Sequence, residues 1–251
     1  MSQTEHTASA SAAPDFLNSW ALRMEQAHDA AKPGAWRKLA LVAAVAGIVF
    51  AVLYAVAYVL LDRTPLGSAS DQELIDYYGD DRNLTLSIAG LVVIPFAGIA
   101  FLWFMVALRA AVGATGIPVS RALGRVQQAG GIVFLALLFV GGAALVATPI
   151  SIRFANGETD PIVARTLPTL GTAVLLFFAM RMAAIFVFTT SSIGRATGLI
   201  PSWFAWVGYG VGVALLLAWT LATWFALLFP AWVAVLCVLV LWRARTTHSE
   251  A

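Results

Sequence analysis

Residues 196–242 read ATGLIPSWFAWVGYGVGVALLLAWTLATWFALLFPAWVAVLCVLVLW, a stretch of 47 residues without one charged side chain. As a single α-helix it would extend about 70 Å, whereas the hydrocarbon core of a bilayer is about 30 Å thick. We therefore expect this stretch to cross a membrane twice. We place the turn at residues 219–224, where Trp219 and Trp224 enclose two threonines, because indole rings favour the membrane–water interface.

Four further runs supply the remaining spans, and only the last of them contains a charge, Arg181. Each run exceeds the roughly 20 apolar residues that a spanning helix needs, and none shows the short alternating segments of a β-barrel. The runs cover residues 39–61, 83–108, 126–152 and 166–194. We therefore predict an all-α polytopic membrane protein, a bundle of six transmembrane helices at about 37–61, 84–108, 128–150, 167–190, 203–220 and 225–242.

The overall composition excludes the other common protein classes. Apolar residues make up 61% of the chain and charged residues 11%, against roughly 25% charged in soluble domains. The single cysteine, Cys237, excludes a disulfide scaffold. The net charge of +2 comes without a basic, aromatic-lined stripe, so we predict no nucleic-acid partner. The predicted partners are membrane lipids and either another membrane protein or a second copy of the chain.

The distribution of Lys and Arg predicts the orientation, because basic residues near the ends of spans favour the cytoplasmic side. Six spans put both termini on one side, and that side then carries Arg23, Lys32, Arg37, Lys38, Arg109, Arg121, Arg125, Arg195, Arg243 and Arg245. The other side carries Arg63, Arg82, Arg153 and Arg165. We therefore predict a multi-pass protein of the cell membrane with both termini cytoplasmic.

The membrane domain is expected over residues 36–243, between cytoplasmic tails at 1–35 and 244–251. Within the first tail, residues 15–31 place apolar side chains on one broad helical face. This pattern predicts an amphipathic helix on the inner leaflet; the alternative is a partly helical tail in solvent.

Side chains that support metal or acid–base chemistry are missing from the predicted spans. The histidines are His6, His28 and His248, all in the predicted tails, and no Asp or Glu falls inside a span. A histidine-based metal or haem site and an intramembrane carboxylate relay are therefore not expected. We predict no catalytic, cofactor-binding or metal-binding residues, and a protein that is not an enzyme.

The acidic residues gather in the outer loop, between Asp62 and Asn83. Within it, Ser70-Asp71-Gln72-Glu73 has the pattern of a capping box and predicts a short helix. The carboxylates of this loop are explained by a solvated surface better than by a cation site, because their spacing does not match a calcium loop.

Arg181 is the one charge inside a predicted span, close to the centre of the 166–194 run. An Arg at mid-membrane costs at least about 2.5 kcal/mol, so we expect it to face the bundle interior. Counting depth from the cytoplasmic side places Tyr209 and Trp232 near its level, which permits a cation–π contact. Two interpretations stay open: a guanidinium satisfied within the bundle by carbonyls or aromatic rings, or a contact for a ligand or partner.

Two parts of the chain share short motifs that hint at a duplication. Residues 114–118 (ATGIP) follow the second span, and residues 196–201 (ATGLIP) follow the fourth, 82 residues later. Spans two and three would then repeat as spans four and five in parallel orientation. The alternative is shared turn chemistry, with Gly ending one helix and Pro opening the next.

Several stretches resemble a family of uncharacterised actinobacterial integral membrane proteins with six helices. Residues 71–78 (DQELIDYY), with 101–104 (FLWF) and Leu108-Arg109, resemble its first half, whereas 129–131 (AGG) and 198–206 (GLIPSWFAW) resemble its second. The similarity covers roughly residues 70–215, and Ser202 stands where a basic residue is expected. The resemblance implies a bacterial cell membrane and no specific activity.

Three functions are compatible with these features. The first is a structural or accessory subunit that packs against another membrane protein. The second is a small-solute or lipid-handling permease in which Arg181 binds an anionic group near the midplane. An intramembrane enzyme comes third, because no residue pattern supports its chemistry.

Overall fold

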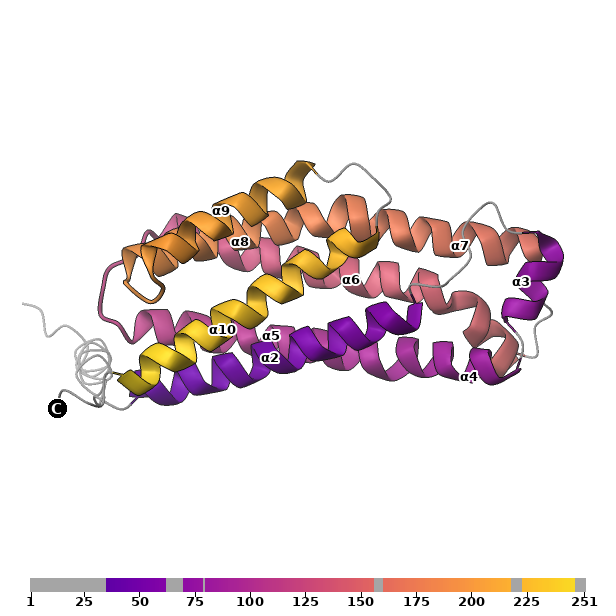
Figure 1. Ribbon diagram of the computed structural model, residues 1–251, viewed down its shortest axis with the longest axis horizontal. Helices are drawn as coiled ribbons and strands as arrows, with labels where there is room; N and C mark the ends of the chain where they lie inside the picture. Colours follow the sequence, from indigo (N-terminus) through magenta and orange to yellow (C-terminus); the bar gives the residue numbers. More distant parts are fainter. Residues whose placement is uncertain (1–34, 62–69, 79, 156–159, 218–222, 247–251) are drawn as a thin grey trace, which may run out of the picture.

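The chain folds into an elongated bundle of helices, seen from the side in Figure 1. The computed structural model describes residues 35–61, 70–78, 80–155, 160–217 and 223–246, and within these it contains helices and no strands. The amphipathic helix predicted at 15–31 and most of the turn predicted at 219–224 lie outside the described residues. The elements are α2 (Ala35–Leu61), α3 (Asp71–Tyr77), α4 (Asp80–Ile88), η1 (Ala89–Val93), α5 (Ile94–Gly113), α6 (Arg121–Ala155), α7 (Pro161–Ala173), η2 (Val174–Ala179), α8 (Met180–Ala196), α9 (Ser202–Leu217), η3 (Thr223–Leu227) and α10 (Leu228–Thr246).

Five helical stretches are long and apolar enough to cross a membrane: Arg37–Leu61, Leu84–Gly113, Arg121–Phe154, Pro161–Ala196 and Trp224–Arg245. The all-α multi-pass prediction is therefore confirmed at this level. The predicted fifth span at 203–220 corresponds to α9, which has only 16 residues within the described part. A helix of that length extends about 24 Å, less than the hydrocarbon core.

The third and fourth spans are longer than predicted. Helix α6 has 35 residues, and α7, η2 and α8 form one continuous stretch of 36, so each extends more than 50 Å. The α7 helix begins well before the predicted residue 167, because Asp160 caps its first turn and Pro161 occupies its first position. Together with α3 and α4, these helices project past the end of α2. The projecting part is on the right of Figure 1.

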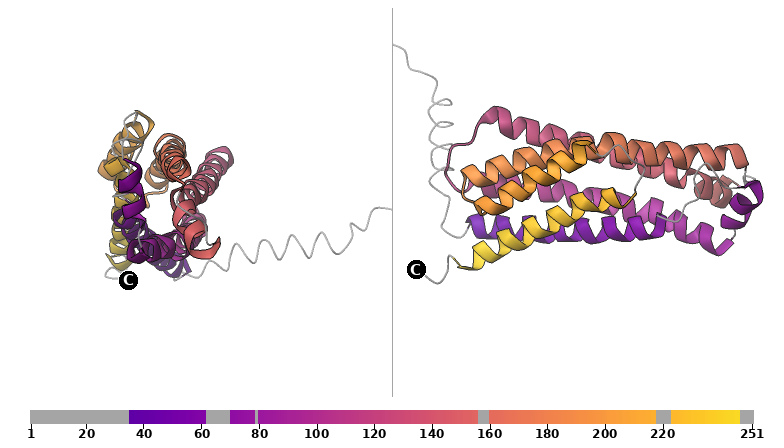
Figure 2. Two further views of the ribbon diagram at one scale, coloured as in Figure 1. Left: turned by 90° about the vertical axis from the view of Figure 1, so that its right-hand side faces the viewer. Right: turned by 45° about the horizontal axis from the view of Figure 1, so that its top comes forward.

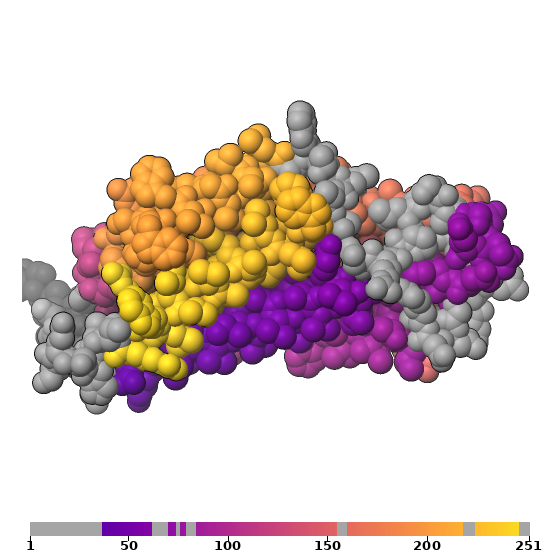
Figure 3. Space-filling view, in the orientation of Figure 1, coloured from indigo at the N-terminus to yellow at the C-terminus, as the bar shows by residue number. Residues whose placement is uncertain are grey.

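The two ends of the bundle differ in charge. We call the end at which α2 begins and α10 finishes the basic end; the opposite end is the α3 end (Figure 2). The basic end carries Arg37, Lys38, Arg109, Arg121, Arg125, Arg195, Arg243 and Arg245. Across one face of the molecule, α9, α10 and α2 lie side by side (Figure 3), and this face runs between the two ends.

Six buried phenylalanine rings fill the centre of the bundle. Phe101 of α5 lies in the middle, and its ring contacts each of the others. Neighbouring ring centroids are 4.8–6.4 Å apart, a range in which edge-to-face and offset pairs stabilise the packing. This phenylalanine core joins helices α2, α5, α6, α8 and α10 through Phe50, Phe101, Phe104, Phe134, Phe186 and Phe229.

Glycines allow the helices around this core to approach closely. A Cβ atom at Gly47 would overlap Phe104 and Cys237, and one at Gly98 would overlap Phe139. Gly98, Gly141 and Gly142 share this role, since each faces a side chain of a neighbouring helix.

Two spans contain a short π-helical segment. Segment η1 (Ala89–Val93) precedes Pro95, and η2 (Val174–Ala179) precedes Arg181. Each of these two spans is followed, two or three residues after its end, by a glycine with left-handed backbone, Gly116 (φ 70°) and Gly198 (φ 66°). These shared features agree with the predicted duplication, but of the helices that follow, the described part of α9 is less than half as long as α6. The duplication therefore stays a prediction.

The phenylalanine core predicts a large difference between two substitutions on α5. Phe101 is completely buried, whereas Phe96 is 58% exposed. We expect Phe101→Ala to lower the free energy of unfolding by about 3–5 kcal/mol, because it leaves a cavity between five helices. Phe96→Ala removes the same atoms from an exposed position and should leave stability nearly unchanged. Unfolding in mixed detergent micelles measures both, and equal losses would contradict the central role of the core.

Candidate functional site

Arg181 lies at the start of α8, directly after the π-helical segment η2. Its side chain is half-buried, whereas its neighbours Met180, Ala183 and Ala184 are completely buried and occupy the inward positions. Arg181 is thus less buried than these three neighbours, and the prediction that it faces the bundle interior stays a prediction. Ala179 and Met180 take the interior space at this depth.

The Arg181 guanidinium is held by its own helix. Nη1 donates a hydrogen bond to the backbone carbonyl of Phe177, one turn earlier. The guanidinium carbon also lies 5.9 Å from the centroid of the Phe177 ring, within the range of a cation–π contact. A backbone carbonyl and an aromatic face were among the predicted kinds of partner. The bond runs toward the α3 end, in the direction in which helical side chains lean.

Tyr209 and Trp232 do not lie beside Arg181. The Tyr209 hydroxyl is 3.1 Å from Ser192 Oγ, and Ser192 follows Arg181 by eleven residues, or about 16 Å of helix. The Trp232 ring stacks on Phe204 at 5.9 Å. The predicted cation–π contact is not formed. Because α8 continues to Ala196, past the predicted end of the span at residue 190, Arg181 lies farther from the basic end than expected. Phe177 takes the place of both residues.

Tyr209 and Trp232 instead belong to a polar cluster in the half of the bundle near the basic end. We define this polar cluster as Gln127 of α6, Thr190, Ser191 and Ser192 of α8, Tyr209 of α9 and Trp232 of α10. Gln127 is only 4% exposed, and its amide Nε2 donates to Thr190 Oγ1 at 2.8 Å. Such a bond between neutral groups stabilises helix association in a membrane by roughly 1 kcal/mol.

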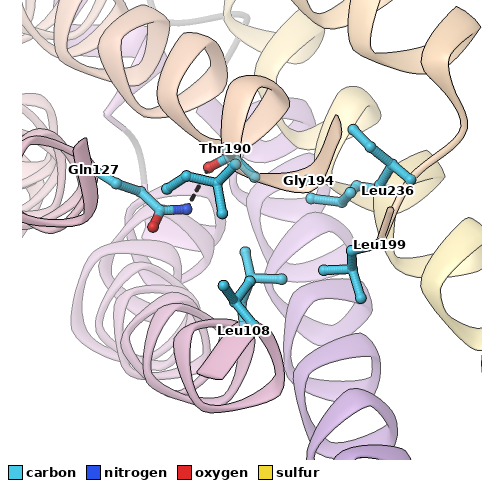
Figure 4. Close-up of a pocket in the computed structure, with 9 residues that line it drawn as sticks. Leu108, Gln127, Thr190, Gly194, Leu199 and Leu236 are labelled. Carbon is cyan, nitrogen blue, oxygen red and sulfur yellow. Dashed lines mark hydrogen bonds between the residues drawn. The ribbon is translucent and has the colours of Figure 1, made fainter. Parts of the chain in front are cut away.

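A small cavity adjoins the Gln127–Thr190 bond (Figure 4). Its volume is about 10 Å³, about the lower limit for one water molecule. Apart from these two polar side chains its walls are apolar: Leu108, Val112, Ile193, Gly194, Leu199, Ile200 and Leu236.

Two further polar groups of the cluster meet at Gly208 of α9. Ser191 Oγ and Trp232 Nε1 are buried without a hydrogen-bond partner among the described residues. The position that a Gly208 Cβ would occupy overlaps Ser191 Oγ and lies 3.2 Å from Trp232 Nε1. The missing side chain at Gly208 therefore brings α8, α9 and α10 together at one point.

The α3 end forms a separate, smaller structure. The predicted capping box is confirmed: the Ser70 backbone N–H donates to a Glu73 carboxylate oxygen at 2.7 Å, and this bond and a second one from the Ser70 hydroxyl lower the Glu73 pKa. Asp71 pairs with Arg165 of α7 at 2.8 Å. At the same end, Tyr78 packs with Leu86 and Ala164, and burial raises the pKa of its phenol to about 12.

Charge patterns alone missed the polar cluster, because its members are uncharged. The signal in the sequence is the run of four hydroxyl residues at 189–192, together with Gln127 inside a charge-free stretch. Within the described ranges, no three His, Cys, Asp or Glu side chains gather closely enough to hold a metal ion.

Comparisons with protein-family models, with curated proteins and with solved structures find no match to this chain. The resemblance to the actinobacterial family therefore stays a prediction.

The close approach at Gly208 can be tested against its neighbour Gly210, whose Cβ position is open. We expect Gly208→Leu to lower the thermal stability, with a loss of about 1–3 kcal/mol, because the added side chain overlaps Ser191 and Trp232. Gly210→Leu adds the same atoms to open space and should be neutral or slightly stabilising. Thermal unfolding followed by circular dichroism measures both. A neutral Gly208→Leu would show that α8 and α9 do not pack at this point.

Proposed function

We propose that the chain is a six-span protein of the cell membrane, with both termini cytoplasmic, that works as a structural or accessory subunit of another membrane protein. A bacterial cell membrane follows from the family resemblance noted above. The main support for a structural role is the phenylalanine core, and the charge distribution supports the orientation.

The orientation is supported by the contrast between the two ends. Eight basic residues of the described part lie at the basic end, and three, Arg82, Arg153 and Arg165, lie at the α3 end. Because positively charged residues favour the cytoplasmic side, the basic end would face the cytoplasm. Helix α2 begins there and α10 finishes there, which agrees with an even number of crossings and makes α9 the short fifth one.

The phenylalanine core carries the proposed role. Six completely or almost completely buried rings occupy the centre of the bundle, where a carrier of polar solutes would need polar side chains or water. The polar cluster lies on one side of these rings and the buried hydroxyls of the α3 end on the other. This separation favours a packed, non-transporting bundle over a permease.

The projecting α3 end offers a surface for a protein partner. Phe154 is 67% exposed and Ile162 is 73% exposed. Ile162 precedes Arg195 by 33 residues, about 50 Å of helix, so it would lie beyond a 30 Å hydrocarbon core that begins at the basic end. Exposed apolar side chains outside the lipid are typical of contact surfaces between proteins.

The orientation can be measured with reporters fused to the C-terminus. A fluorescent protein that matures only in the cytoplasm should be active there, whereas alkaline phosphatase, which is active only outside, should be inactive. A control fusion after residue 160, at the α3 end, should give the reverse pattern. Phosphatase activity at the C-terminus would exclude the proposed orientation.

The accessory role predicts a specific partner that depends on the α3 end. We expect the full chain, extracted in native lipid particles, to co-purify in fixed stoichiometry with one other membrane protein, identified by mass spectrometry. Ile162→Ser should reduce the recovered partner severalfold by making the contact surface polar. Ile117→Ser makes the same change in an exposed residue at the basic end and should have no effect. A chain that purifies alone as a monomer would contradict the proposal.

A further inference from the structure

Three arginines come together at the basic end, where α5 finishes and α6 begins. Arg121 and Arg125 are one turn apart on the same side of α6, and Gly124 lies within that turn. Arg109, near the end of α5, extends across this glycine: its guanidinium carbon and Nη2 each lie 3.3 Å from the position that a Gly124 Cβ would occupy. The missing side chain of Gly124 therefore lets Arg109 lie against α6 beside the other two arginines. We call Arg109, Arg121 and Arg125 the arginine cluster.

The arginine cluster is exposed and lacks an acidic partner among the described residues. The chain is described without a gap from residue 80 to residue 155, through both helices and the connection between them, and all three arginines are exposed. Within the described part, the salt bridge joins Arg165 and Asp71 at the α3 end, and no hydrogen bond or ion pair involves the cluster. The described acidic residues also belong to the α3 end: Asp71, Glu73, Asp76, Asp80, Asp81 and Asp160.

The convergence of these charges is unfavourable without an anion. Like charges four residues apart on a helix repel each other, and Arg109 adds a third positive charge from the neighbouring helix. The preference of basic residues for one side of a membrane explains why the three lie at this end, but it does not require them to converge at one point. An anion bound between them would offset the repulsion, and phosphate oxygens match the paired N–H donors of a guanidinium.

The surface that continues from the cluster toward the middle of the bundle is apolar. On α5, Leu102 and Val106 precede Arg109 by seven and three residues, and they are 45% and 53% exposed. On α6, Ile132 follows Arg125 by seven residues and is 56% exposed. Residues at these spacings share a helix face. Cationic side chains at the end of a span, next to exposed apolar ones deeper in it, match a phospholipid better than a soluble anion, which gains nothing from the apolar surface.

We propose that the arginine cluster binds the phosphate group of a phospholipid with net negative charge, in the leaflet at the basic end. The acyl chains of that lipid would lie along α5 and α6, against Leu102, Val106 and Ile132. This proposal rests on the placement of the bundle in a membrane, but on neither the proposed orientation nor the subunit role. A chain that inserts the other way round, or that has no protein partner, would still bind the lipid at the same residues.

Native mass spectrometry of the full chain tests the proposal, with phosphatidylglycerol and phosphatidylcholine added in equal amounts to the protein in detergent. We expect the wild-type chain to retain phosphatidylglycerol preferentially, and Arg109→Gln to weaken that binding about tenfold, as for loss of a charge-assisted hydrogen bond. Arg245→Gln is the matched control, because it removes the same charge from an exposed position of α10 at the same end, and it should bind like the wild type. Equal binding by the two variants, whether lowered or unchanged, would overturn the proposal.

A second variant, Gly124→Ala, changes the geometry of the cluster without removing a charge. The added methyl group overlaps the flexible end of the Arg109 side chain, which can move away. We therefore expect phosphatidylglycerol binding to fall severalfold while the thermal stability stays near that of the wild type. Gly113→Ala adds the same methyl group at the end of α5, where its position is open, and should bind normally. Normal binding by Gly124→Ala would contradict the proposed role of Arg109.

Two measurements on the wild-type chain keep the result clear if a variant does not fold. Equal retention of phosphatidylglycerol and phosphatidylcholine would show that the cluster does not select an anionic lipid, and the proposal would fail. Inorganic phosphate added in excess should not displace the bound phosphatidylglycerol. If it does, the cluster binds soluble phosphate, and the lipid assignment is wrong.

Discussion

The packing of phenylalanine rings between five helices is the constraint on which the rest of the bundle depends. In lipid, helices gain little from burying apolar surface, because lipid tails are equally apolar, so association depends on close packing. Phe101 provides this packing at the centre, where α2, α5, α6, α8 and α10 converge. Glycines on the surrounding helices, such as Gly47 beside Phe104, let the backbones approach closely enough for the rings to touch.

This core divides the polar groups of the molecule into separate sets. The polar cluster, with Gln127 bonded to Thr190, lies toward the basic end, and the Asp71–Arg165 pair lies at the α3 end. Arg181 belongs to neither set, because it bonds to its own helix. The same rings that hold the helices together therefore separate the polar groups of the two halves of the bundle.

The charges in the sequence were sufficient to predict the helical class and five of the spans, because a charge is costly in lipid and marks the ends of helices. They were insufficient for helix length: α7 begins at Pro161, before the charge-free run, through a local cap at Asp160. The predicted fourth span also ended too early, at residue 190 instead of Ala196, and depth counted from that end placed Arg181 beside Tyr209. The polar cluster was invisible to the same reasoning, since Gln127 and Ser191 carry no charge and only tertiary packing brings them together.

The π-helical segment η2 has a consequence for the helix that contains it. A π turn closes its hydrogen bond over one residue more than an α turn, as in the bond from Met180 N–H to the Leu175 carbonyl. The extra residue rotates everything after it by about 100° relative to a continuous α-helix. Residues spaced as on one face of α7 therefore do not continue onto the same face of α8. Each half of the span can match its own neighbours, and a helical wheel drawn through residues 161–196 as one helix would assign half of them to the wrong face.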